Sequence, residues 1–253
     1  WLVMGACARK TERQIKEKDL KMKLVTLNIR HGGGARVKSI LNAIEVHNPD
    51  ILLLTEFRNN DNGNLIRRSL KENGYVYQEV GEASPKVNTL LLVSKIPFTV
   101  CKNFSNLESH SHRLIMGSFG TFKILGYYFP QGEDKFPVFE ELILMFKEQQ
   151  KEPFIALGDL NTGKHYQDEN GKTFIAADKI DEVEQYSVDA WRLFHNDKKE
   201  YSWFSHQGNG FRIDQAFATA SMADRLSDVR YSHIEREDKI SDHSAMIIEF
   251  SPD

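Results

Sequence analysis

Residues 23–56 read KLVTLNIRHGGGARVKSILNAIEVHNPDILLLTE, and this stretch indicates the class of fold. It opens with a short run of β-type residues, turns at three glycines and continues into residues 36–47, where apolar side chains recur at helical spacing. Pro49 ends that helix. The apolar residues 51–54 that follow are typical of a strand buried on both faces. A strand, a helix and a buried strand in this order predict an α/β fold.

The alternation of strands and helices continues to the end of the chain. Further helices are expected over residues 62–73, 135–149 and 178–194. Further strands are expected at 88–94, 113–119, 122–129, 153–159, 200–204, 211–219, 229–234 and 244–250, the second and third of them joined by a hairpin at Gly120-Thr121. Together they predict one layered domain with mixed sheets over residues 22–253. We expect residues 1–21 to form a charged, solvated arm or the remnant of a leader.

Composition excludes some classes of protein. The chain has 253 residues and a formal net charge of −3, which argues against a protein that coats nucleic acid passively but not against an enzyme with a local basic groove. Two cysteines are too few for a zinc site made of cysteines. No apolar run reaches the length of a membrane span, and we expect a cytoplasmic monomer. The alternative is that Trp1 to Cys7 (WLVMGAC) ends a secretory signal, with Cys7 as the lipid-attachment site of an extracytoplasmic lipoprotein.

Polar side chains end, interrupt or directly precede the predicted strands at several points. These residues are Asn28, Glu56, Asp159, Asn161, Asp214, Asp242 and His243. In open α/β sheets, ligands bind at strand ends, where loops project side chains from a rigid scaffold. One such carboxylate would mean little, but this many in one chain predict a functional site.

The motif GDLN places two of these residues on one side of the chain. Side chains two positions apart in an extended stretch point the same way, so Asp159 and Asn161 can converge on one reacting atom. A carboxylate there can accept a proton from water, while the amide donates to a phosphate oxygen. The alternative is a turn rich in Asp and Asn after a strand, which is common.

Glu56 follows a continuous apolar run, so its carboxylate must be paired or must bind a cation. Mg²⁺ prefers one or two carboxylates together with water and substrate phosphate, and Glu56 with Asp242 would suffice. The alternative is a salt bridge from Glu56 to Arg30 or Arg58. His243 beside Asp242 supplies a titratable donor next to a charge, or it is simply a hydrogen-bonded structural histidine.

Several motifs together resemble a known family. LNIRHGGG, LLLTEFR, YYFPQG, ALGDLN, YSWF, FRIDQAF and SDHSAMIIEF occur in the order of the endonuclease/exonuclease/phosphatase superfamily, and the match is similar to its exonuclease III-like nucleases over roughly residues 23–250. The resemblance implies a four-layer sandwich, in which two mixed β-sheets pack face to face with helices outside. It also implies a hydrolase of phosphodiester bonds that depends on Mg²⁺ or Mn²⁺.

The resemblance implies roles for single residues. Glu56 looks like the main metal ligand, with Asn28 and Asp242 beside it. Asp159 looks like the group that orients or deprotonates the attacking water, and Asn161 looks like a donor to the scissile phosphate.

A second group of residues resembles the phosphate-binding part of the family's site. His243 looks like an imidazole that stabilises the phosphate and is held by Asp214. Tyr128 matches a tyrosine that contacts the phosphate near the leaving group, and Gln131 stands where the repair enzymes commonly have Asn. Arg30 and His31, close to a strand end, are expected to bind substrate phosphates.

The substrate is less clearly indicated. Trp203, Phe211 and Ile213 match the apolar pocket with which the repair enzymes accept a flipped-out abasic sugar, or they are core residues of two paired strands. TEFR departs from the QE motif usual there, and the SHQGNG loop is short. We expect DNA as the partner. The alternatives are a small phosphorylated molecule, a lipid headgroup, or a binding module that has lost catalysis.

Overall fold

The structure is a computed structural model that describes residues 21–102, 104–170 and 174–253. Apart from Lys21, the expected N-terminal arm lies outside the described residues, and so does Cys7. No helix in the described part of the chain is both long enough and apolar enough to span a bilayer.

The strands form two six-stranded sheets. Sheet A has the order β13 (Leu226–Ser232), β14 (Ala245–Phe250), β1 (Met22–Asn28), β2 (Ile51–Phe57), β4 (Thr89–Ser94) and β3 (Tyr77–Val80). Sheet B has the order β5 (Thr99–Lys102), β6 (Leu114–Ser118), β7 (Lys123–Tyr128), β8 (Phe154–Asp159), β12 (Asp214–Ala218) and β9 (Val188–Asp189). Strands β1 and β2 run parallel, as do β7 and β8, whereas the other neighbours are antiparallel, so both sheets are mixed.

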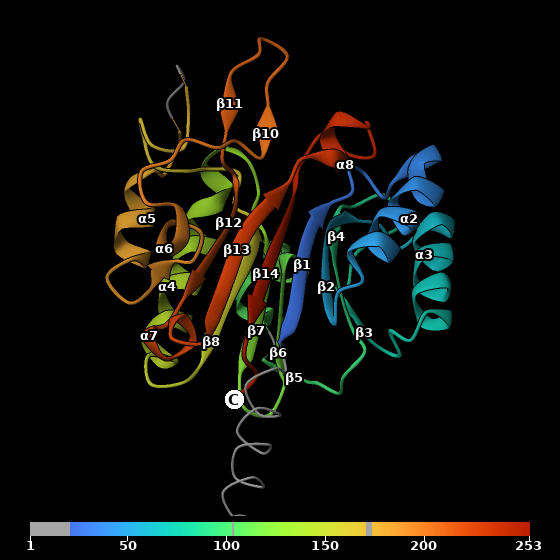
Figure 1. Ribbon diagram of the computed structural model, residues 1–253, viewed down its shortest axis with the longest axis horizontal. Coiled ribbons are helices and arrows are strands. Elements are labelled where there is room, and N and C mark those ends of the chain that lie inside the picture. The colour runs from blue at the N-terminus through green and yellow to red at the C-terminus, as the bar shows by residue number, and fades with distance from the viewer. Residues whose placement is uncertain (1–20, 103, 171–173) are drawn as a thin grey trace, which may run out of the picture.

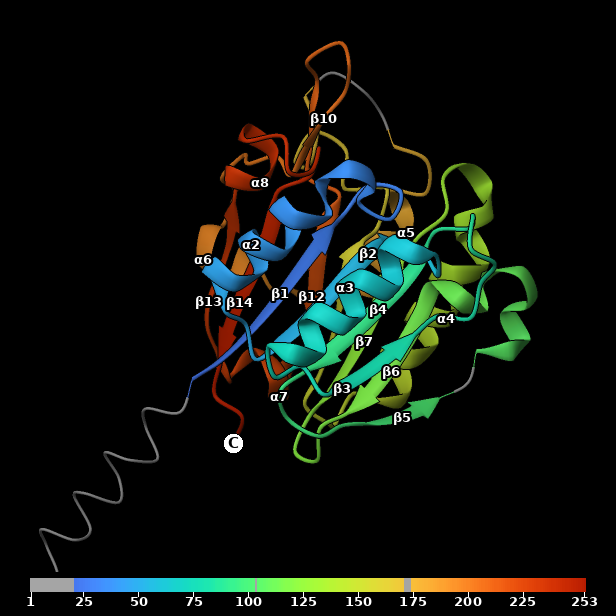
Figure 2. The ribbon, with the colours of Figure 1, turned by 90° about the vertical axis from the view of Figure 1, so that its right-hand side faces the viewer.

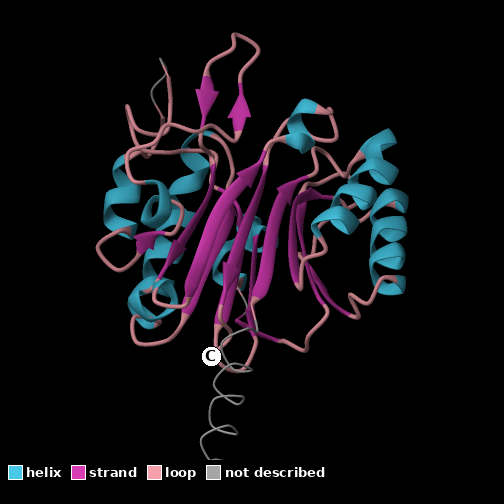
Figure 3. Ribbon diagram, viewed as in Figure 1, coloured by secondary structure: helices cyan, strands magenta, loops and turns pink. Residues whose placement is uncertain are grey.

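The helices lie outside the sheets. They are η1 (Gly34–Arg36), α2 (Val37–His47), α3 (Asp61–Glu72), η2 (Ser105–Arg113), η3 (Gly132–Lys135), α4 (Phe136–Glu148), α5 (Asp178–Val183), α6 (Arg192–His195), α7 (Ala220–Ala223) and α8 (Ile234–Glu237). Figures 1 and 3 show α2 and α3 on one flank and α4 and α5 on the other, with the strands between them. Figure 2 shows the same layers from the side. The predicted four-layer sandwich is confirmed.

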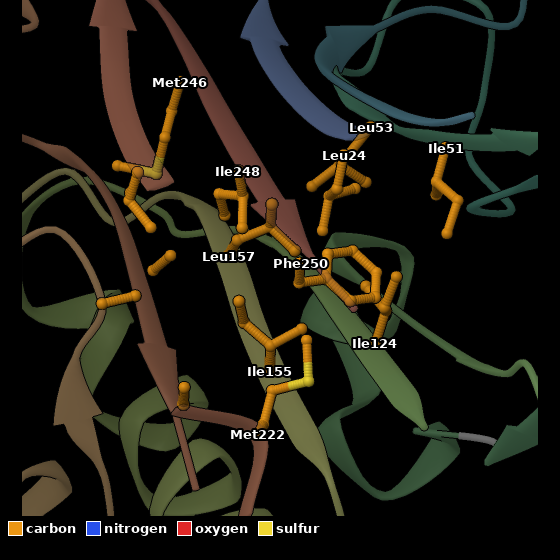
Figure 4. Close-up of a cluster of buried hydrophobic side chains, with 14 of the residues drawn as sticks. Leu24, Ile51, Leu53, Ile124, Ile155, Leu157, Met222, Met246, Ile248 and Phe250 are labelled. Carbon is orange, nitrogen blue, oxygen red and sulfur yellow. The ribbon is translucent and has the colours of Figure 1, made fainter. Parts of the chain in front are cut away.

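The central core fills the space between the sheets. Leu24 and Leu53 of sheet A belong to one apolar cluster with Ile155 and Leu157 of sheet B, and Figure 4 shows part of this cluster. The sheets approach so closely that a Cβ at Gly126 would lie 2.4 Å from a Leu53 methyl carbon. Two further apolar clusters pack α2 and α3 on sheet A and α4 and α5 on sheet B. The continuous apolar runs noted in the sequence are therefore strands with both faces covered.

Local signals explain where the helices begin and end. Helix α2 ends at His47. The next residue, Asn48, adopts the left-handed conformation (φ 46°), donates its backbone N–H to the Ile44 carbonyl and precedes Pro49. Helix α3 begins after Asn60, whose side chain accepts the N–H of Gly63 at 3.0 Å. The helices predicted at 36–47, 62–73 and 135–149 are confirmed within about two residues.

The helix predicted over residues 178–194 is wrong. Helix α5 ends at Val183, and the chain then forms strand β9 before the short helix α6. Val188 pairs with Ala218 of β12, and the Asp189 carboxylate accepts from Arg212, so tertiary contacts override the helical spacing. The short edge strands β3 and β5 had no counterpart in the prediction, because partly exposed strands of four residues carry little apolar signal.

Candidate active site

Three strands of sheet B bring polar side chains into register. Tyr128 at the end of β7 pairs with Asp159 at the end of the parallel strand β8. Asp159 in turn pairs with Asp214, where the antiparallel strand β12 begins. Gly158 adopts a φ of 144°, and a Cβ there would lie 1.9 Å from the Tyr127 carbonyl oxygen, so the residue before Asp159 must be glycine.

Sheet A contributes Asn28 and Glu56 at the same edge. Glu56 is the extra residue of a β-bulge between Thr55 and Phe57, and its φ of 53° lies in the left-handed region. A bulge redirects a side chain at the edge of a sheet, here toward the facing sheet. The Asn28 amide donates to Glu56 Oε1 at 3.2 Å and to Asp159 Oδ2 at 2.9 Å, and it thereby joins the two sheets.

The Glu56 carboxylate is held by neutral donors. Its Oε2 accepts the His31 backbone N–H at 2.9 Å and the Asn88 amide at 3.1 Å. Arg58 reaches Glu56 only indirectly, because its Nε donates to Asn88 Oδ1 at 2.7 Å. The His31 backbone N–H, at the start of the glycine-rich turn, therefore binds a carboxylate of the same chain. These donors fix the direction of the carboxylate.

Asn88 was missed by the sequence analysis. Asn88 was predicted only as the first residue of the strand at 88–94, and in the structure it stands immediately before the first residue of β4. Because β4 runs antiparallel to β2, its beginning lies beside the end of β2. An Asn before a buried antiparallel strand was the signal that could have identified it.

His243 and Asp214 form a buried pair. The imidazole Nδ1 lies 2.8 Å from Asp214 Oδ2, and both side chains are almost inaccessible. Burial alone would lower the pKa of His243, but the Asp214 carboxylate outweighs it and raises that pKa to about 10. The ring is therefore protonated at neutral pH. Nδ1–H donates to Asp214, and Nε2–H remains for a ligand.

Ser241, also missed, orients this histidine. Its hydroxyl accepts the backbone N–H of His243 at 3.1 Å and donates to the Asn28 carbonyl at 2.5 Å. The SDH motif is in this way tied to the end of β1. Ser241 is the first residue of the SDH motif quoted in the sequence analysis, so the sequence did contain a signal for its role.

Asp159 lies in the centre of the site. Burial raises its pKa to about 7, the charges of Asp214 and Glu56 add to this, and His243 opposes it. The Asn161 backbone N–H donates to Asp159 Oδ1 at 2.9 Å. A carboxylate with a pKa near neutrality is suited to accept a proton from water.

Asn161 and Lys135 border the cavity beside Asp159. Asn161 has a φ of 52°, and one amide hydrogen is donated to the Phe129 carbonyl at 2.8 Å, which leaves the other for a ligand. The buried ammonium group of Lys135 donates to the Asn161 carbonyl at 2.7 Å. Burial lowers the pKa of Lys135 to about 8. The sequence analysis missed Lys135, because a lysine opening an ordinary amphipathic helix gives no sign of burial.

Tyr128 presents a neutral phenol to the site. Its hydroxyl lies 3.5 Å from Glu56 Oε1, and the Arg113 guanidinium lies 4.8 Å from the ring centroid. Burial, followed by the charge of Glu56, raises the pKa of Tyr128 to about 12. The hydroxyl therefore stays protonated and remains a hydrogen-bond donor.

These groups surround one cavity of about 670 Å³. Of the predicted residues, Arg30, His31, Glu56, Tyr128, Gln131, Asp159, Asn161, Trp203, Phe211, Ile213, Asp242 and His243 line it. Asn28 and Asp214 lie directly behind it, in contact with Asp159 and His243. Trp203 and Phe211 belong to the hairpin of β10 (Trp203–Phe204) and β11 (Gly210–Phe211), which projects beyond the sheets in Figure 1. Phe174 and Ile175 complete the apolar wall and were missed, because they stand in an irregular segment.

Two sets of residues could hold a metal ion. Asp159, Asp214 and His243 offer ligand atoms within 4.8 Å of one another. A protonated imidazole cannot ligate a metal, however, and Nδ1 of His243 already donates to Asp214.

The second set is Glu56, Asp242 and Asn28, which supplies the oxygen ligands that Mg²⁺ prefers. Asp242 Oδ2 lies 3.7 Å from Arg30 and 3.4 Å from Trp203 Nε1. Its Oδ1 is buried and accepts no hydrogen bond from the described residues. Such an orphaned carboxylate oxygen fits a cation, so we favour this set.

The fold and the cluster of acids, amides and imidazole at the strand ends define a class of phosphoester-bond hydrolases. The model of the Endonuclease/Exonuclease/phosphatase family matches residues 25–243, and the chain belongs to that family. The predicted resemblance is confirmed.

Solved structures share the fold at low sequence identity. A structure of the 3′ phosphatase NExo from Neisseria, bound to a product DNA hairpin, is 20% identical with a TM-score of 0.77. An AP endonuclease from Archaeoglobus fulgidus is 19% identical with a TM-score of 0.77, and the 3′–5′ exonuclease NExo from Neisseria meningitidis is 21% identical with a TM-score of 0.75. Each alignment covers 90% of this chain and 99% of the other. A search of curated proteins finds no significant match.

Proposed function

We propose that this protein is a divalent-metal-dependent phosphodiesterase that hydrolyses DNA. One observation carries the proposal: the Asn28–Asp159 hydrogen bond joins the two sheets at a point where Glu56 and the His243–Asp214 pair also converge. The cavity thus brings together a general base (Asp159), an imidazolium group hydrogen-bonded to a carboxylate (His243 with Asp214) and a carboxylate of fixed direction (Glu56). This arrangement is suited to in-line displacement at phosphorus.

The residues divide the work by their environments. Asp159 orients the attacking water and accepts its proton, consistent with a pKa of about 7. The second N–H of His243 and the free amide hydrogen of Asn161 stabilise the charge that develops on the phosphate oxygens. Tyr128, a neutral phenol, donates to the oxygen on the leaving-group side.

Glu56 and Asp242, with Asn28 beside them, would hold Mg²⁺ or Mn²⁺. When bound, the ion supplies positive charge against the negative charge that develops on the phosphate. Asn88 and the His31 backbone keep the Glu56 carboxylate aimed at this position.

DNA is the substrate that three observations favour. The solved structures with this fold include a phosphatase bound to a DNA hairpin and an AP endonuclease. In this chain, Arg30 and His31 stand at the mouth of the cavity with side chains 53% and 62% exposed, where they can contact phosphates. The apolar wall of Trp203, Phe211 and Ile213 can receive an unstacked sugar or base.

The test is cleavage of a duplex oligonucleotide that carries one abasic-site analogue, in Mg²⁺, in Mn²⁺ and in EDTA. The proposal predicts metal-dependent incision or 3′ shortening, abolished by Asp159→Asn and by His243→Ala in variants that keep the wild-type circular dichroism spectrum. A parallel assay follows bis(p-nitrophenyl) phosphate. Hydrolysis of that compound without any DNA cleavage would move the substrate to a small phosphorylated molecule or a lipid headgroup. Activity unchanged in both variants would contradict the proposed mechanism.

A further inference from the structure

A second cavity of about 410 Å³ adjoins the catalytic cavity. Phe174 lines both cavities. The polar side chains of the second cavity include His165, Gln167 and Asp178. None of these residues belongs to the proposed catalytic machinery, so this cavity has no part in the chemistry described above.

A file of aromatic rings connects the two cavities. Successive centroids lie 6.3 Å apart from Tyr166 to His165, 6.5 Å from His165 to Phe174 and 5.5 Å from Phe174 to Phe211. The file continues from Phe211 to Trp203 at 5.7 Å and from Trp203 to His243 at 6.4 Å. It therefore runs from an exposed tyrosine to the catalytic imidazole. Stacking on successive aromatic faces is how single-stranded nucleic acid is bound without regard to sequence.

The charge in the second cavity favours a neutral occupant. Its lysine, Lys164, forms ion pairs with Asp181 at 3.1 Å and with Glu184, so this cation is already neutralised. A further phosphate would also approach the carboxylates of Asp178 and Asp181. A flat neutral group would instead stack on Phe174 and His165 and hydrogen-bond through its edge to Gln167 or Asp178. A nucleobase has this chemistry.

We propose that the second cavity binds a nucleobase of the substrate strand, close to the scissile phosphate, by stacking on Phe174 and His165. The inference rests on the proposed function and sharpens it. A base that is paired in a duplex would have to be extruded before it could enter, at a cost in free energy. The preferred substrate therefore carries an unpaired strand at this position, as in a single-stranded or frayed end.

The first experiment measures kcat/KM on single-stranded oligonucleotides in which the bases flanking the cleavage point are replaced, one at a time, by a tetrahydrofuran abasic unit. In the wild-type protein, removal of one particular base should lower kcat/KM by about ten-fold, and pairing that base with a complementary strand should do the same. In His165→Ala and Phe174→Leu the substrates with and without the base should be cleaved at similar rates.

Tyr77→Ala is the matched control, because Tyr77 is an exposed aromatic residue on strand β3 and lines neither cavity. This variant should discriminate between the substrates as the wild type does. A second measurement is independent of turnover. An oligonucleotide with 2-aminopurine at the sensitive position, bound in EDTA, should lose fluorescence with the wild type and keep it with His165→Ala.

The outcomes separate the inference from the function on which it rests. Cleavage of DNA with equal rates for substrates with and without each base would overturn the nucleobase site and leave the nuclease intact. If the protein neither cleaves DNA nor quenches the 2-aminopurine fluorescence, both the nucleobase site and the proposed nuclease function are contradicted. Co-sedimentation with phosphatidylcholine/phosphatidylglycerol vesicles that is lost in Tyr166→Ser, without any dependence on bases, would assign the aromatic file to a lipid surface and overturn the proposal.

Discussion

Two clusters of charged residues lie on either side of Ile213, and they differ in how their charges are balanced. Arg212 is 1% exposed and donates to Asp168 at 2.7 Å and to Asp189 at 2.5 Å, while Arg192 also pairs with Asp168. Two arginines face two aspartates, so this cluster is closed. It ties β9 and the segment around Asp168 to the beginning of β12.

The cluster that contains Asp214 is open. Glu56, Asp159, Asp214 and Asp242 are four acids in or behind one cavity, and His243 is their buried protonated partner. Glu56 is held by two amides and one backbone N–H group, and Asp242 keeps a buried oxygen without a donor among the described residues. The comparison indicates that the closed cluster stabilises the fold, whereas under the proposed function the open cluster would be completed by a cation and a substrate from outside.

The largest expected effect comes from Asp159→Asn, which should lower kcat by about 10²- to 10⁴-fold because the base is lost. The pKa of Asp159 is raised to about 7, so the folded state holds its proton more tightly than the unfolded chain does. The ionised carboxylate therefore destabilises the fold at pH 8, and the variant should melt at the same temperature or higher. Turnover and thermal melting measured on one preparation check this. An unchanged kcat would contradict the assigned role.

In contrast to Asp159→Asn, Arg212→Met should lower the stability of the fold. It leaves two buried aspartates without their main partner, and the free energy of unfolding should fall by about 3–5 kcal/mol. Urea denaturation measures the loss. The control is Arg230→Met, which removes partly exposed pairs with Asp228 and Glu249 and should cost no more than about 1 kcal/mol. Equal losses in the two variants would mean that the Arg212 cluster is not a structural centre.

Asn88→Ala tests the support of the Glu56 carboxylate. The variant removes the amide that donates to Glu56 Oε2 and accepts from Arg58. Loss of such an outer partner should raise the Mg²⁺ concentration for half-maximal activity by about 10- to 100-fold. Asn62→Ala is the control, because Asn62 is an exposed donor to the Gly34 carbonyl. The same Mg²⁺ requirement in Asn88→Ala as in the wild type would exclude this role.

Acid titration should show a smaller effect, which comes from the closed cluster around Arg212 and is measured as a change in the free energy of unfolding. Burial would raise the pKa of Asp168, but Arg212 outweighs it and holds that pKa below its ordinary value. An unfolded aspartate titrates near ~3.9, so this contribution is complete above that pH and is lost as the pH falls through the folded pKa. We expect the free energy of unfolding to drop below about pH 4, by about 1.4 kcal/mol per unit of pKa shift, and less steeply in Asp168→Asn. Equal slopes in the two proteins would contradict the ion-pair account.

The sequence predicted the open cluster better than the closed one. Strand-terminal residues such as Glu56 and Asp159 are visible because a polar residue after an apolar run is unusual. All the predicted site residues prove to line one cavity or to lie directly behind it. Their roles in catalysis remain proposals.

What the sequence left out depends on contacts between distant segments. Asp168, Asp189 and Arg212 come from three separate stretches, and nothing local in the sequence marks them as partners. The same cluster explains the wrong helix at 178–194, because Asp189 is drawn to Arg212 instead of continuing a helix. The bulge at Glu56 and the burial of Lys135 likewise arise from tertiary packing.

The most direct test of the account is Mn²⁺ binding, measured by titration calorimetry on the wild type and on Glu56→Gln, with Asp168→Asn as a control outside the cavity. The account predicts that the wild type and Asp168→Asn bind Mn²⁺ and that Glu56→Gln loses this binding while it keeps its fold. Undiminished binding in Glu56→Gln would contradict the account, because the ion would then lie elsewhere and the open cluster would not be completed by a metal at Glu56.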